Sequence, residues 1–144
     1  MEKYKYLEHT ADALFEAYGR TEREMISNAA LAMANVMYDV SKVQAKASEK
    51  VEVKGDDLEE LLHNFLEEIL FRISAGERLY SFFGVNSIVK SPKTREFVMQ
   101  AELRGEPVDA EKHVLKTEIK AVTWNQFRVE EKEGQWVARV LVDI

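Results

Sequence analysis

Two segments of the chain carry apolar residues at helical spacing, and each is preceded by a residue that suits a helix N-terminus. Thr21 and Asp57 stand at these positions, and each is followed three residues later by a Glu, as in a capping box. The apolar face of the first segment comprises Ile26, Ala29, Ala30, Met33, Ala34 and Met37, and that of the second comprises Leu58, Leu61, Leu62, Phe65, Leu66, Ile69, Leu70 and Ile73. The spacing predicts two amphipathic helices, the second with Gly76 as its C′ residue.

Most of the remaining chain alternates between apolar and polar residues, which is typical of half-buried strands. The predicted strands are 3–8, 12–19, 48–55, 79–90, 94–104, 115–130 and 135–143. Turns at 91–93 and 132–134 join the last four strands into two hairpins, and a short helical turn is predicted at 110–113. The order ββαβα followed by antiparallel strands predicts an α+β fold with a mixed, mostly antiparallel sheet and two helices on one face.

Composition narrows this picture to one domain covering residues 1–144. Hydrophobic residues make up 46% of the 144 positions, only two prolines occur, and no linker or repeat is visible. The absence of cysteine excludes disulfides, thiolate metal sites and cysteine nucleophiles. The N-terminus has no apolar signal region, and no apolar run approaches the roughly 20 residues of a membrane span, so we expect a cytoplasmic protein. A net charge of −6 disfavours nucleic-acid binding as the primary role.

Carboxylates at two places suggest a cation site. Asp143 and Ile144 end a strongly apolar strand, and Asp143 together with the α-carboxylate of Ile144 forms a dense set of oxygen donors. Hard cations such as Ca²⁺ and Mg²⁺ prefer such ligands. Asp12 follows the strand break His9-Thr10-Ala11 and completes the set if its loop lies beside residue 144. The alternatives are a turn at residues 9–12 and a solvated terminus.

The other polar candidates are less specific. His113 and Lys120 stand alone, and the residues by themselves favour surface or satisfied positions for both. His63 is expected to be structural, and Trp124 and Trp136 are expected to pack together in the core. The chain has no Walker loop, dinucleotide-binding glycine pattern or nucleophile elbow, and its three histidines are too scattered for a zinc enzyme.

Six short segments, none of them specific alone, follow the order and spacing of a known family. They are His9–Asp12, Asn28–Met33, Asp57–Leu62, Gly105-Glu106 before Asp109 and His113, Ile119–Thr123, and Trp136–Asp143. Through them the chain resembles the archease family over its whole length. One departure is Asn125, which follows Trp124 where the family usually has His after an aromatic residue. Asn cannot titrate, so no proton-transfer role is predicted for it.

The resemblance implies a strand–helix–strand–strand module with an insertion, acting as a small partner of the tRNA-splicing RNA ligase. That ligase joins 3′-phosphate ends with GTP, and archeases are expected to promote its guanylylation and repeated turnover. The implied metal ligands are Asp12, Asp143 and Ile144, with Ca²⁺ expected in the isolated protein and Mg²⁺ or Mn²⁺ as alternatives. Lys120 would contact a phosphate or an acidic partner residue, supported from the rim by His9, Glu106 and His113. GTP and tRNA would be reached only through the ligase.

Three other functions remain open. A metal-dependent phosphohydrolase would use Asp12 and Asp143 as ligands and Lys120 as electrophile, and would turn over substrate alone. A chaperone-like module for RNA-modifying enzymes would need no metal. A direct RNA-binding module is disfavoured by the net charge of −6.

Overall fold

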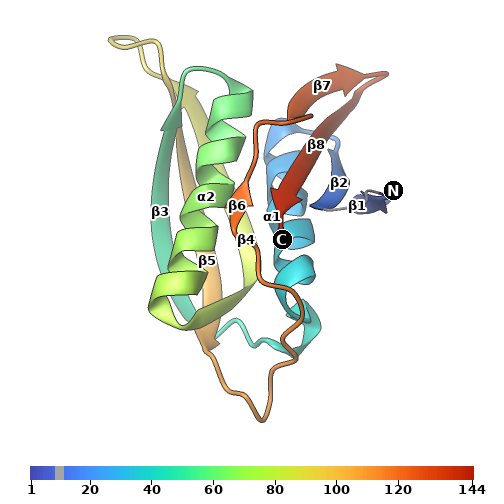
Figure 1. Cartoon of the computed structure of the whole chain (residues 1–144). Coiled ribbons are helices and arrows are strands. Elements are labelled where there is room, and N and C mark those ends of the chain that lie inside the picture. Colours follow the sequence, from blue (N-terminus) through green and yellow to red (C-terminus); the bar gives the residue numbers. More distant parts are fainter. Residues whose placement is uncertain (9–11) are drawn as a thin grey trace.

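A computed structural model describes residues 1–8 and 12–144 of the chain (Figure 1). The elements in chain order are β1 (Tyr4–Leu7), β2 (Asp12–Gly19), α1 (Glu22–Met37), a 3₁₀ turn η1 (Val40–Lys42), β3 (Ala47–Gly55), α2 (Leu58–Gly76), β4 (Arg78–Lys90), β5 (Phe97–Pro107), β6 (Ala121–Val122), β7 (Arg128–Lys132) and β8 (Gln135–Asp143). Within the described ranges, no helix combines the length and the apolar character needed to cross a membrane.

Both helices begin at the predicted caps. The Thr21 side chain accepts a hydrogen bond from the backbone N–H of Glu24, and Asp57 does the same for Glu60. The two Glu side chains reach back one residue further than in a simple capping box, since they accept from the N–H of residues 20 and 56. α2 continues through Gly76, and Glu77 takes the left-handed conformation with a φ of 52°, so the predicted C′ position was one residue too early.

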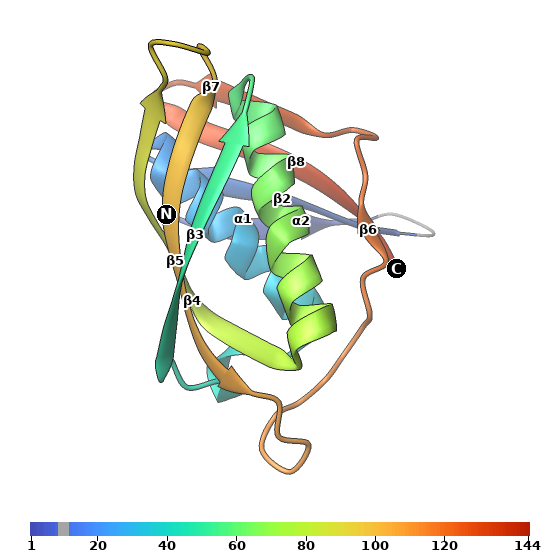
Figure 2. The ribbon, with the colours of Figure 1, turned by 90° about the vertical axis from the view of Figure 1, so that its left-hand side faces the viewer.

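The strands divide into two sheets, with the helices between them. One sheet has five strands in the order β1-β2-β8-β6, with β7 also paired to β8, and the other has three in the order β3-β5-β4. All of these pairs are antiparallel. α1 contacts β2 and β8 on one side and β4 on the other, and α2 packs mainly on β3 (Figure 2). The α+β class is therefore confirmed, while the single predicted sheet is replaced by two.

One hydrophobic core fills the space between the helices and both sheets. The five-stranded sheet contributes Phe15 and Val140, α1 contributes Met25 and Met33, and α2 contributes Phe65, all fully buried. Since side chains alternate along a strand, the residues next to Phe15 and Val140 point to the outer face of this sheet. That outer face carries Asp12, Glu16, Arg139 and Asp143.

The predicted strand 115–130 is the largest error in the sequence-based assignment. Leu115 forms only an isolated bridge with Tyr38, and the ladder is limited to residues 121–122 and 128–132. Between these two stretches the chain turns, with an N–H of Phe127 donating to the carbonyl of Trp124 and a positive φ of 58° at Gln126. The alternating pattern of residues 115–130 therefore reflects the burial of single residues along an irregular segment and does not reflect a continuous strand.

Candidate functional site

Asp12 and Asp143 lie directly opposite each other at the open end of the five-stranded sheet. They are register partners in the antiparallel pair β2–β8, and both are half-buried. This position follows from β8, whose neighbours are β2 on one side and β6 and β7 on the other. Their pairing places two carboxylates directly opposite each other, an arrangement of like charges that costs a sheet stability.

β6 brings Lys120 to the same place. Ala121 is the β6 partner of Asp143, and the backbone N–H of Lys120 donates to the Asp143 carbonyl at 2.7 Å. Asp143 is thus held from both sides by backbone pairing, and Ile144, which is 38% exposed, follows it directly. Of the seven candidate residues, the fold unites Asp12, Asp143, Ile144 and Lys120, while His9 lies outside the described residues.

The donors gathered here have the chemistry of a hard-cation site. Asp12 and Asp143 supply side-chain carboxylate oxygens, which hard cations prefer, and the carboxylate of Ile144 stays the predicted third ligand. In residues 1–8 and 12–144, no three His, Asp or Glu side chains converge to hold a metal. The predicted set contains only two such side chains, so it depends on the main-chain carboxylate for its third ligand.

α2 fixes the position of β6 through His63 and Glu67. The Nε2 of His63 lies 2.9 Å from the Val122 carbonyl, and the Val122 N–H donates to Glu67 Oε1 at 3.1 Å. Since a carbonyl oxygen only accepts, Nε2 carries the proton. His63 is buried, as predicted for a structural residue, and its spacing of four from Glu67 places both on one side of α2.

An exposed aromatic side chain covers this His63–Val122 contact. Trp124 is 55% exposed, and its ring stacks on His63 with centroids 3.9 Å apart and an angle of 10°. Phe127 meets both rings edge-on. Trp136 is elsewhere, on β8 opposite Gly19, so the two tryptophans do not form the predicted core pair. The sequence pattern predicted the turn at 132–134 but gave no sign of the turn at 124–127, which displaces Trp124 from the strand.

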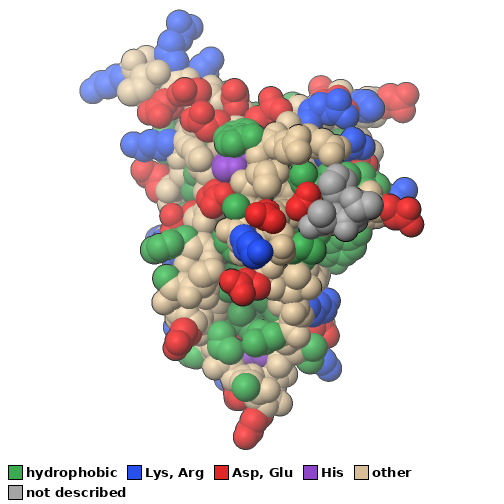
Figure 3. All heavy atoms as spheres, in the orientation of Figure 1, with side chains coloured by type: hydrophobic (Ala, Val, Ile, Leu, Met, Phe, Trp, Pro, Cys, Tyr) green, Lys and Arg blue, Asp and Glu red, His purple; other side chains and the backbone are tan. Residues whose placement is uncertain are grey.

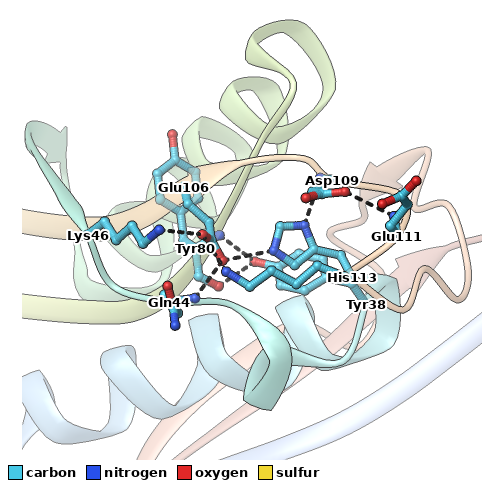
Figure 4. A network of polar contacts seen from close by, with 9 residues as sticks. Tyr38, Gln44, Lys46, Tyr80, Glu106, Asp109, Glu111 and His113 are labelled. Atoms are coloured by element: carbon cyan, nitrogen blue, oxygen red, sulfur yellow. Dashed lines mark hydrogen bonds and ion pairs between the residues drawn. The ribbon is translucent and has the colours of Figure 1, made fainter.

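Glu106 and His113 form a separate, buried network (Figure 4). Glu106 Oε2 accepts from the Gln44 N–H at 2.8 Å and from His113 Nε2 at 2.9 Å, and Oε1 accepts from Lys112 at 2.8 Å. The Asp109 N–H donates to His113 Nδ1, which leaves the imidazole proton on Nε2, facing Glu106. The network thereby fastens the loop after β5 to the segment before β3.

These contacts set the ionisation of Glu106. The Gln44 N–H, the Lys112 ammonium and the His113 N–H all favour the carboxylate, and they lower the pKa of Glu106 from 4.5 to about 2. The side chains of Glu106 and His113 are only 6% and 1% exposed. Their expected contact with a partner or phosphate stays a prediction, and it would require the loop to open.

Comparison with known proteins identifies the family. A sequence model described as the Archease protein family (MTH1598/TM1083) matches residues 4–144. Protein archease of Methanosarcina mazei is 44% identical over 142 residues, covering 99% of this chain and 96% of the relative. Protein archease of Pyrococcus abyssi is 37% identical over 146 residues, covering all of both chains.

Solved structures agree with this assignment. The solution structure of Methanobacterium thermoautotrophicum protein 1598 superimposes with a TM-score of 0.83 at 33% identity over the full length of both chains. The crystal structure of an archease and possible chaperone from Thermotoga maritima shares the fold, with a TM-score of 0.60 at 18% identity and coverage of 97% and 96%. The α+β fold is thus shared with these structures, and the chain belongs to the archease family.

Proposed function

We propose that this protein is an accessory factor that activates the GTP-dependent 3′-phosphate tRNA-splicing ligase. It would promote guanylylation of the ligase, and with it multiple turnover, without catalysing a reaction itself. The observation that carries the proposal is the register pairing of Asp12 with Asp143 beside the backbone of Lys120. Membership in the archease family supports the same role, since the chain matches archeases over its full length.

The proposed site would hold a divalent cation on Asp12, Asp143 and Ile144, with Ca²⁺ expected in the isolated protein. A cation there would neutralise phosphate charge at the partner's active site. The sheet supplies the rigidity, because backbone pairing fixes both strands that carry the carboxylates. Lys120 is exposed next to them and would contact a phosphate or an acidic residue of the partner as a point charge.

The proposed partner is therefore a protein, and tRNA and GTP would be met only on the ligase. The expected compartment is the cytoplasm.

Two alternative functions make different demands on the same residues. A chaperone-like modulator of RNA-modifying enzymes needs no carboxylate pair, and a phosphohydrolase needs no ligase. The Thermotoga archease is described as a possible chaperone, so the experiment must also distinguish the chaperone-like function.

The test is guanylylation of the purified ligase by GTP, with and without this protein. Asp12→Asn and Asp143→Asn keep the side-chain volume and remove the charge. Asp56→Asn is the matched control because Asp56 is exposed in the turn between β3 and α2, outside the five-stranded sheet. We expect stimulation by the wild type and the control, and loss in both site variants. Equal stimulation by folded Asp12→Asn and Asp143→Asn would favour the chaperone-like function, and phosphate release without ligase would favour the hydrolase.

A further inference from the structure

Two arginines face each other across neighbouring strands on the outer face of the five-stranded sheet. Arg128 of β7 is the register partner of Arg139 of β8, and Arg139 is also the partner of Glu16 of β2. Like charges directly opposite each other destabilise an antiparallel pair. Such a pair in an otherwise well-satisfied sheet indicates a position kept for binding rather than for stability.

The hydrogen-bonding capacity of these two guanidinium groups is only partly used. Glu16 Oε2 accepts from Arg139 Nε at 3.2 Å and Nη2 at 3.0 Å, which leaves three of the five N–H donors of Arg139 without an acceptor in the described part of the chain. Arg128 is 56% exposed, and its Nε is 4.0 Å from Glu130, beyond hydrogen-bond range. Glu130 lies closer to Lys132, at 3.3 Å.

A hollow lies between these donors. It has a volume of about 290 Å³ and is lined by Gln126, Phe127, Arg128 and Arg139. Gln126 is one of the few non-glycine residues with a positive φ, at 58°, a conformation that is enriched at ligand sites. The volume is at the lower limit for a small-molecule pocket, so it suits one small group rather than a whole nucleotide.

We propose that Arg128 and Arg139 form a phosphate-binding site on the outer face of this sheet. A phosphate carries up to two negative charges and enough oxygens to accept from two guanidinium forks at once. A bound phosphate would convert the repulsion between the two arginines into attraction on both sides. Glu16 and Glu130 reduce the local positive charge, so binding is expected to be weak, in the millimolar range for a free ion.

The proposed phosphate site lies on the same face of the sheet as the carboxylate pair. Arg139 and Asp143 are four residues apart on β8 and therefore on the same face, roughly 13 Å apart along the strand. Figure 3 shows Lys and Arg side chains gathered over β7 and β8, on the face that also presents the acidic side chains near the C-terminal end. The proposal does not depend on the ligase, because it concerns only what Arg128 and Arg139 bind.

The experiment is an NMR titration that follows backbone amides and the Nε–H signals of the arginines. Inorganic phosphate is added at constant pH, with sodium chloride of equal ionic strength as the reference. We expect saturable shifts at Arg128, Arg139 and Gln126 that chloride does not produce. Shifts that are absent, or that appear equally with chloride, overturn the proposal.

Variants make the assignment specific. Arg128→Ala removes an exposed side chain whose ion pair with Glu130 is long, at 4.0 Å, so the fold should persist. It should weaken phosphate binding by at least about tenfold. Arg128→Lys keeps the charge but loses the fork, and should fall between wild type and Arg128→Ala. Arg104→Ala removes an arginine on the other sheet, bonded to Glu102, and should leave binding unchanged. Equal losses in Arg104→Ala and Arg128→Ala overturn the proposal.

The source of the phosphate is resolved by two further titrations, with a nucleoside 5′-monophosphate and with a short single-stranded RNA. Binding of the RNA that is tighter, steeply salt-dependent and lost in Arg128→Ala identifies a polynucleotide phosphate as the natural ligand. Binding of the mononucleotide and inorganic phosphate alone identifies a free phosphate group. RNA binding that is indifferent to Arg128→Ala contradicts the assignment of this site.

Discussion

The Nε2 of His63 lies 2.9 Å from the carbonyl oxygen of Val122, and this hydrogen bond fastens the long helix α2 to the short strand β6. β6 has only two residues in the ladder, so it depends on such side-chain support. Because the next residues toward the N-terminus are Ala121 and Lys120, α2 indirectly holds Lys120 beside Asp143.

Replacement of His63 by Ala should therefore loosen β6. The change removes a buried hydrogen bond and the stacking of Trp124, and we expect the free energy of unfolding to fall by about 2–4 kcal/mol. Urea denaturation followed by circular dichroism measures this loss. Trp124→Ala removes the stacking on His63 and the contact with Phe127 but leaves the hydrogen bond, and should cost about 1 kcal/mol. An equal loss in the two variants would therefore contradict a role for the His63–Val122 hydrogen bond.

The carboxylate pair should show opposite effects with and without a cation. In metal-free buffer, Asp143→Asn removes the repulsion from Asp12 and should raise the free energy of unfolding by about 0.5 kcal/mol. Added Ca²⁺ should raise the melting temperature of the wild type and have no effect on Asp143→Asn. Differential scanning calorimetry with Asp56→Asn as control measures both effects, and a variant that still responds to Ca²⁺ would place the cation elsewhere.

Acid should weaken the loop that Glu106 anchors. The folded-state pKa of Glu106, about 2, lies below its ordinary value of 4.5. The contribution of Glu106 to stability is therefore fully present above pH 4.5 and is lost as the pH falls toward 2. Urea midpoints at pH 7 and pH 3 should differ more for the wild type than for Glu106→Gln. Parallel pH dependence in the two proteins would exclude Glu106 as the source.

Two glycines offer a matched test of backbone packing. A methyl group at Gly105, in β5, would collide with the backbone carbonyl of Leu79, whereas Gly76, in α2, has open space around it. Gly105→Ala should lower the free energy of unfolding by about 2 kcal/mol or more. Gly76→Ala should raise it by about 0.5–1 kcal/mol, because alanine favours the helix. Similar values for the two variants, by thermal denaturation, would contradict this packing of β4 against β5.

Local signals in the sequence predicted the helices and the first five strands well, because caps and periodicity are properties of neighbouring residues. Thr21 and Asp57 cap α1 and α2 as expected, and β2 begins and ends at its predicted residues. The same signals failed for residues 115–130, since Ile119 and Phe127 are buried although they lie in an irregular segment and not in a strand. Periodicity records which residues are buried and not what buries them.

The sequence by itself determined the α+β class, the helix starts and the presence of carboxylates at residues 12 and 143. Only the tertiary structure decided that these two carboxylates are direct partners, that the strands form two sheets, and that Glu106 and His113 pair with each other. It alone placed Arg128 opposite Arg139. The reason is physical: strand register and strand order are set by packing between residues far apart in the chain, and a local pattern carries no record of its partner.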